Sequence, residues 1–120
     1  DFVDYASLLS EAAAESGTDA EARALRSVFG PAPRLAVTAP KASLGHGLGA
    51  AGAFGVLVAA MALHHQVLPA TRGLTAETVD PECALDHVIG SSRPAPLGAV
   101  LVNAAGFGGQ NAAVLLRAAP

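Results

Sequence analysis

Short apolar runs that end near glycine or proline recur along the chain and predict strands. They occupy residues 1–5, 35–39, 98–103 and 112–117. Because only a glycine-rich stretch separates the last two runs, we expect them to form a hairpin. Residues 67–96 carry four prolines and predict a long connection made mainly of loops.

Helical spacing of apolar residues predicts a helix over residues 19–29. The positions that set this spacing are Ala22, Leu25, Val28 and Phe29. Thr18 or Asp19 can cap the start of the helix, and Gly30-Pro31 stops it. The preceding residues 6–17 are polar and rich in alanine, which indicates a connection that is helical in part.

A second helix is expected over residues 49–66, and it is apolar on all sides. Its apolar run is shorter than the ~20 residues that a bilayer requires, and it ends in His64-His65-Gln66. Small residues recur at every third or fourth position, which indicates a central helix packed tightly on every side. We therefore expect a buried helix of a soluble protein and no membrane span.

The composition favours a single domain with one face covered by another polypeptide. Of 120 residues, 52% are hydrophobic and 14% are charged, which is an apolar balance for a small free-standing domain. The net charge of −3 gives no support to nucleic-acid binding. The single cysteine excludes an internal disulfide framework and fits a reducing cytosol. Since the chain enters strand-like sequence directly at Asp1, we expect it to be part of a longer or two-piece protein.

Two glycine-rich segments carry the candidate chemistry. Residues 41–52 read Lys-Ala-Ser-Leu-Gly-His-Gly-Leu-Gly-Ala-Ala-Gly, so Lys41 stands five residues before His46 at the start of the apolar helix. A nearby cation biases the protonation and orientation of an imidazole, so we expect Lys41 and His46 to lie close together and to face inward. Residues 103–111 read Asn-Ala-Ala-Gly-Phe-Gly-Gly-Gln-Asn and lie between the last two strands.

Together these two segments resemble the C-terminal half of a β-ketoacyl synthase of the thiolase-like fold. The patterns of that family run Lys-Ser-x-x-Gly-His-x-x-Gly-Ala-Ala-Gly and Asn-Ser-Phe-Gly-Phe-Gly-Gly-x-Asn-Ala. The resemblance covers nearly the whole chain. It implies an α/β fold with a mixed sheet between helices, and it makes residues 1–120 the C-terminal domain of a ketosynthase.

The resemblance also implies roles for individual residues. His46 corresponds to the histidine that donates a hydrogen bond to the thioester oxygen during decarboxylation and condensation, and Lys41 to the cation that orders this network. The backbone N–H of Ala105 would complete an oxyanion hole, followed by a turn of Gly106, Phe107, Gly108 and Gly109. The family usually has phenylalanine and serine where this chain has Ala105 and Ala104, so both departures widen the site.

The remaining cysteine and histidines indicate structural positions. Cys83 lacks the strained turn and helix start that activate a nucleophilic cysteine, so we expect it to be a small buried residue. The nucleophile of the family belongs to its N-terminal half. His64, His65 and His87 have no metal-ligand spacing, and no metal or resident cofactor is expected.

A second family histidine has no counterpart in this chain. In ketosynthases it stands in a His-Gly-Thr motif after a strand, whereas residues 1–7 read Asp-Phe-Val-Asp-Tyr-Ala-Ser and no histidine precedes His46. We place the missing residue at or near Ala6. Losing one of two donors should cripple decarboxylation.

Three hypotheses follow for the function. The chain belongs to a chain-length-factor-like subunit that pairs with an active ketosynthase in type II polyketide or fatty-acid synthesis in the bacterial cytoplasm. Alternatively, it belongs to a ketosynthase that condenses or transfers acyl groups with an altered site, or it is a non-catalytic interaction module. The first hypothesis implies as partners the complementing N-terminal half, a ketosynthase subunit and an acyl carrier protein. The acyl groups would be carried on the phosphopantetheine of that carrier protein, with no nucleic acid and no membrane involved.

Overall fold

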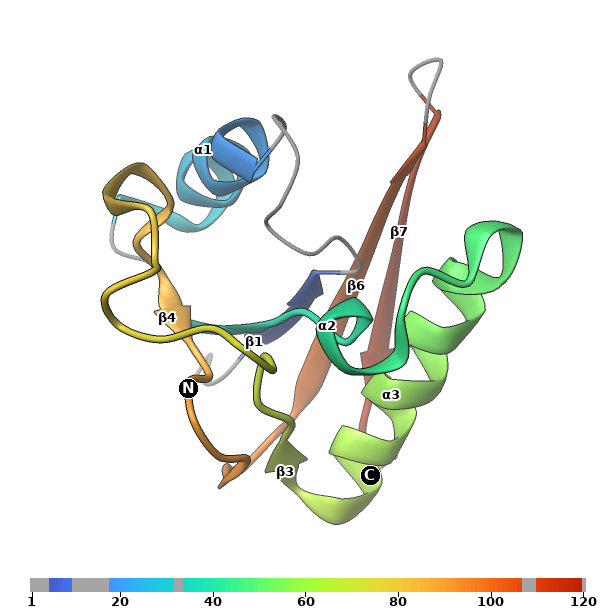
Figure 1. The fold of residues 1–120 in the computed structure, drawn as a ribbon. Helices are drawn as coiled ribbons and strands as arrows, with labels where there is room; N and C mark the ends of the chain where they lie inside the picture. Colours follow the sequence, from blue (N-terminus) through green and yellow to red (C-terminus); the bar gives the residue numbers. More distant parts are fainter. Residues whose placement is uncertain (1–4, 10–17, 32–33, 107–109, 120) are drawn as a thin grey trace.

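A five-stranded mixed sheet forms the centre of the computed structural model, which describes residues 5–9, 18–31, 34–106 and 110–119 (Figure 1). The strand order is β4-β2-β1-β6-β7. The first four strands in this order are parallel to their neighbours, and β7 is antiparallel to β6. The strands of this sheet are β1 (Tyr5–Leu9), β2 (Leu35–Thr38), β4 (Asp86–His87), β6 (Ala99–Gly106) and β7 (Gln110–Arg117).

Within the described ranges, three α-helices and several short elements connect these strands. The helices are α1 (Thr18–Phe29), α2 (Lys41–Leu44) and α3 (Ala51–His65). The connection from α3 to β6 contains the small antiparallel pair of β3 (Val67–Leu68) and β5 (Arg93–Pro94). Single 3₁₀ turns lie at Leu48–Ala50 and Pro81–Cys83.

The alternation of side chains along β2 shows that the two main helices lie on opposite faces of the sheet. Leu35 and Val37 pack with Leu25 of α1, whereas Ala36 packs against the cluster that contains Ala59 of α3. Because successive residues of a strand point to opposite faces of a sheet, α1 and α3 cover opposite faces (Figure 1). This arrangement matches the expected mixed sheet between helices.

Only one face of α3 is buried in this chain. The buried positions are the small residues Gly55, Ala59 and Ala62, which lie on the side where α3 contacts β6. The larger apolar side chains Phe54, Leu57 and Met61 are exposed. Our expectation of tight packing on every side is therefore wrong for the described chain. The small residues bring α3 close to the sheet, and its large residues form an uncovered apolar face.

The segment Leu48–His65 is long and apolar enough to cross a membrane by length and composition, and 17% of it is buried. Those two criteria are weak evidence alone, because core helices of soluble proteins also meet them. The contact of α3 with β6 is direct evidence that one side of the segment packs on protein.

Gln66 joins the end of α3 to the start of β6. It has a left-handed backbone conformation, with a φ of 55°, immediately after the helix. Its side-chain amide accepts a hydrogen bond from the Leu97 N–H at 2.7 Å and donates to the Leu97 carbonyl and to the Leu63 carbonyl. These bonds compensate for a backbone conformation that non-glycine residues rarely adopt.

Most predicted elements are confirmed, with shifted boundaries. The helix predicted at 19–29 and the strand at 35–39 correspond to α1 and β2, and α3 begins two residues later than expected. The hairpin is confirmed by the antiparallel pairing of β6 and β7. The first strand was misplaced: β1 spans Tyr5–Leu9, so residues 6–9 are strand instead of connection, and residues 1–4 lie outside the described part of the chain.

A glutamate should be tolerated on the exposed face of α3 but should prevent folding on the buried face. We expect the free 120-residue chain to self-associate through its apolar face. Leu57→Glu, at a position 58% exposed, should reduce this association and leave the unfolding temperature nearly unchanged. Ala59→Glu, at a position 0% exposed, should prevent folding, because burying a charge costs on the order of several kcal/mol. Sedimentation and thermal circular dichroism measure both effects, and a cooperatively folding wild-type monomer would contradict the expectation.

Candidate functional site

The pairing of β1 with both of its neighbours brings the two glycine-rich segments to one edge of the sheet. Leu8 of β1 pairs with Thr38 of β2 on one side and with Val102 of β6 on the other. The three strands are parallel, so Thr38 and Val102 lie at the same level. The chain beyond each of them, including Lys41 and His46 after β2, therefore emerges at the same edge.

A short helical turn carries Lys41 away from the end of β2. Pro40 precedes α2, and the Gly45 N–H closes the turn by donating to the Lys41 carbonyl at 2.9 Å. Gly45 has a φ of 76°, a left-handed conformation that glycine adopts without strain. The chain continues from this turn into His46, and the 3₁₀ turn at Leu48–Ala50 leads into α3.

A backbone hydrogen bond holds the imidazole of His46. The Leu48 N–H donates to His46 Nδ1 at 2.9 Å. When Nδ1 of a neutral imidazole accepts a hydrogen bond, the ring proton resides on Nε2, which is then a donor. Leu48 has a φ of 48°, unusual for a branched residue, and this conformation accompanies the bond. Nothing in the sequence had indicated a role for Leu48.

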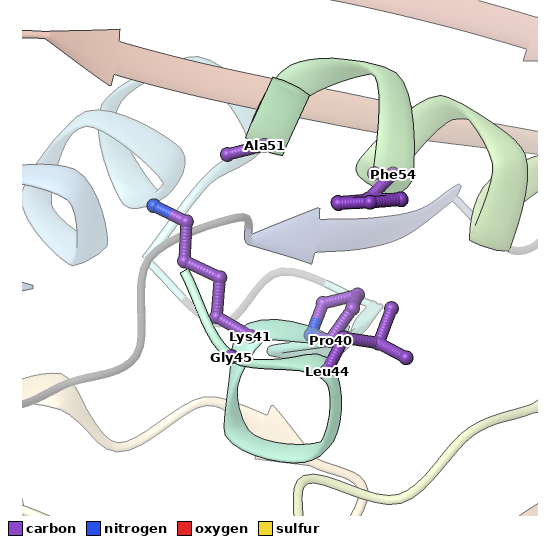
Figure 2. A pocket seen from close by; sticks show the side chains of 7 residues that line it. Pro40, Lys41, Leu44, Gly45, Ala51 and Phe54 are labelled. Carbon is purple, nitrogen blue, oxygen red and sulfur yellow. The ribbon is translucent and has the colours of Figure 1, made fainter. Parts of the chain in front are cut away.

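The structure places Lys41 and His46 differently from our expectation. His46 is exposed in this chain, whereas we expected both side chains to face inward. Lys41 is half-buried and lines a pocket between α2 and the first turns of α3, with Leu44, Ala51 and Phe54 (Figure 2). Figure 2 shows the Lys41 side chain extending from α2 along the edge of this pocket. The burial of His46 that we predicted would require a surface that the described residues do not supply.

The aromatic ring of Phe54 packs directly over Gly47. A Cβ atom at Gly47 would lie 2.6 Å from Cε2 of Phe54, closer than real contacts allow. Glycine at this position therefore lets the ring of α3 approach the loop that carries His46. In contrast, a Cβ at Gly49 would meet no atom within 4 Å.

The second glycine-rich segment begins as strand. Ala104, Ala105 and Gly106 belong to β6 and pair with Ala112, Asn111 and Gln110 of β7. Placing Gly106 in the turn was therefore wrong, since the ladder continues through it and β6 extends beyond the predicted end at Asn103. Phe107, Gly108 and Gly109 lie outside the described residues. The small side chains at 104 and 105 add little bulk to this end of β6.

The position proposed for the missing histidine lies inside the sheet. Ala6 is the second residue of β1 and pairs with Ala36 and Val100, whereas the carboxyl end of the strand is Leu9. A residue at the edge where β2 and β6 end would therefore follow Leu9 and not Ala6. Residues 10–17 lie outside the described part of the chain, and none of them is histidine.

Cys83, His64 and His65 occupy structural positions, and His87 of β4 pairs with Val37 of β2 and has its Nε2 2.9 Å from the Cys83 carbonyl. Cys83 is buried in a 3₁₀ turn that contacts α1, as we expected of a structural cysteine. Arg26 of α1 fixes this region by donating to the carbonyls of Glu82 and Ala84. His64 and His65 are exposed at the end of α3. Among the described residues, no three His, Cys, Asp or Glu side chains gather as metal ligands would.

Comparison with known proteins decides the family. Residues 10–75, more than half of the chain, match the sequence profile of the "Beta-ketoacyl synthase, C-terminal domain" family. This chain belongs to the β-ketoacyl synthase family. The resemblance drawn from the two glycine-rich segments is thereby confirmed.

Individual relatives agree with this assignment. The chain is 43% identical over 98 residues to 3-oxoacyl-[acyl-carrier-protein] synthase 2 of Mycobacterium tuberculosis, covering 82% of this chain and 23% of that protein. It is 37% identical over 114 residues to putative polyketide beta-ketoacyl synthase 1 of Streptomyces halstedii, covering 95% and 26% of the two chains. The ishigamide ketosynthase/chain length factor superposes with a TM-score of 0.89 at 29% identity, covering 97% and 28%. The chain thus spans about a quarter of the length of these relatives and has their thiolase-like fold.

The contact between Gly47 and Phe54 predicts different outcomes at two neighbouring glycines. Gly47→Ala should destabilise the fold by about 1 kcal/mol, because the exposed ring of Phe54 must move. Gly49→Ala should be neutral or stabilise by about 0.4–1 kcal/mol, since its site is open. Denaturant unfolding of both variants, and of Gly47→Ala in a Phe54→Ala background, measures the coupling. Equal costs at the two glycines would contradict the proposed contact.

Proposed function

We propose that this chain is the C-terminal part of a ketosynthase-family subunit that works in the decarboxylative condensation of acyl and malonyl thioesters on an acyl carrier protein. Within that reaction we assign it the chain-length-factor-like role, next to a subunit that performs the condensation. Membership of the β-ketoacyl synthase family supports the reaction class. The observation that carries the assigned role is that the chain keeps His46, held by the Leu48 N–H, without a second histidine before it in the sequence.

The chemistry of that site follows from the tautomer of His46. When malonyl thioester loses CO₂, negative charge develops on the thioester oxygen, and a positioned N–H donor stabilises it. With Nδ1 accepting from Leu48, Nε2 of His46 carries the hydrogen that such an oxygen requires. Donors of this kind are typically worth about 3–4 kcal/mol in related oxyanion sites.

The count of histidines favours the chain-length-factor-like role over a condensing one. The family places a second histidine at the end of the first strand of this half, and no histidine precedes His46 in the sequence. A site with one of two donors loses stabilisation that the other cannot replace. The condensing chemistry would then belong to a partner ketosynthase with a cysteine and two histidines.

A second candidate is a ketosynthase that retains activity with an altered site. The observation in its favour is that His46 is still held in the donor tautomer by Leu48, an arrangement that a purely structural histidine does not require. In that case the condensation itself would depend on His46.

The uncovered face of α3 supports contact with another part of a synthase. Phe54, Leu57 and Met61 present an apolar surface. We assign its cover to the remaining, N-terminal part of the synthase, because the matched relatives are about four times as long as this chain. A ketosynthase subunit and an acyl carrier protein complete the proposed assembly, which we place in the cytoplasm.

Substitution of His46 separates the two candidates. The full-length protein, assembled with its ketosynthase partner, is assayed for product from malonyl and acyl groups on the carrier protein. His46→Ala in this chain should leave turnover within about twofold, whereas loss of the matching histidine in the partner should reduce it at least about 100-fold, the usual effect of removing one oxyanion donor.

The control is His65→Ala, which removes an exposed histidine from the end of α3 and should leave turnover unchanged. Abolished turnover in His46→Ala, with assembly intact, would overturn the chain-length-factor-like role in favour of an active ketosynthase. Absence of product in any combination, with carrier protein and partner loaded, would contradict both candidates.

A further inference from the structure

Two buried threonines lie at the root of the segment that carries Lys41 and His46, which we call the site loop (residues 39–48). Thr38 is 0% exposed and Thr71 is 9% exposed. The Thr38 hydroxyl donates to the Pro69 carbonyl at 2.7 Å. The hydroxyl oxygen of Thr71 accepts a hydrogen bond from the Ala39 N–H at 2.9 Å. Thr71 follows Ala39 by 32 residues in the sequence, and helix α3 lies between them in the chain.

The Ala39 amide requires a partner that the sheet does not provide. The pairing of β2 ends at Thr38 on the β1 side and at Val37 on the β4 side. Ala39 comes after both ladders, yet it remains buried. A buried backbone N–H without an acceptor is strongly unfavourable, so the oxygen of Thr71 replaces the next rung of the sheet.

Thr71 is itself fixed to the same strand. Its N–H donates to the Val88 carbonyl at 2.8 Å, and the Val88 N–H donates to the Val37 carbonyl at 2.9 Å. Val88 is buried in the main core cluster. A closed path of hydrogen bonds therefore runs from Val37 through Val88 and Thr71 back to Ala39, and it leaves little freedom in the direction in which the chain departs from β2.

The site loop begins at the residue that Thr71 holds. The Ala39 carbonyl accepts from the Ala42 N–H at 3.1 Å, which starts the turn of α2. The end of α2 closes on Lys41 and leads directly to His46 and its bond from Leu48. A shift of Ala39 would therefore be transmitted through one rigid turn to the imidazole.

We propose that Thr71 is a positioning residue for the site loop: through the Ala39 amide it sets the path of α2 and thereby the orientation of His46. Thr71 reaches the imidazole only through this backbone path, so it is not a catalytic residue. The value of an oriented His46 rests on the proposed function, but the mechanical role of Thr71 does not. It can therefore be tested without any measurement of turnover.

The test is amide hydrogen exchange of the natural full-length protein, with the Leu48 amide as reporter because it donates to His46. Thr71→Val keeps the shape of the side chain and removes the acceptor. We expect exchange of the amides from Ala42 to Leu48 to become at least about tenfold faster, with α1 unchanged. Thr71→Ser, which restores the acceptor, should return exchange to the wild-type rate.

Thr38→Val is the matched control, since it also removes one buried hydroxyl at the root of the loop but leaves the Ala39 amide bonded. Its effect on the Leu48 amide should be less than about threefold. Equal acceleration in both valine variants, no acceleration in Thr71→Val or no rescue by serine would overturn the proposal. If Thr71→Val fails to fold, Thr71→Cys decides: its weak sulfur acceptor should give intermediate exchange, and a wild-type rate would overturn the proposal.

Discussion

The parallel pairing of β1 with β2 and β6 is the constraint on which the rest of the site depends. It sets Thr38 and Val102 at one level and sends both glycine-rich segments to the same edge of the sheet. The loop after β2 supplies a histidine whose tautomer is set by a backbone amide, and the end of β6 supplies a ladder with small side chains. The register of three strands directs both segments to the same edge of the sheet.

The apolar helix α3 lies next to this edge and has an apolar face that the described chain leaves exposed. Its small residues allow close packing on β6, and its larger residues are left without a cover. The first turn of α3 also places Phe54 over Gly47 beside the site loop. The surface that needs a partner and the loop that carries His46 are therefore adjacent, so whatever covers α3 also shapes the surroundings of the imidazole.

The sequence predicted the elements whose signals are local. Helix α1 has a periodic apolar face and a Gly-Pro stop, and β2 is an apolar run before a proline, so both were located within one or two residues. The boundaries of β1 were predicted wrongly because Phe2 and Val3 are as apolar as Leu8 and Leu9. Composition alone cannot select which of these residues pair in the sheet. The family followed from the spacing of residues within the two glycine-rich segments, and the first of these segments also pointed to His46 as a candidate.

Other features of the site depend on contacts between distant residues and had no local signal. The positive φ of Leu48 is unexpected for leucine, and the bond from Ala39 to Thr71 spans 32 residues. The exposure of α3 could not be predicted either. The sequence of an all-apolar helix predicts burial whether the covering surface belongs to the same chain or to another one.

A crystal structure of the full-length protein with its partner subunit would test the central claim most directly, namely that this chain supplies one edge of a ketosynthase-type site. The account predicts that Phe54, Leu57 and Met61 become buried against the rest of the synthase. It also predicts that His46, still bonded to the Leu48 amide, faces a cavity shared with the end of β6. An α3 face that remains bare, or a His46 that points away from β6 with its Nδ1 released, would contradict it.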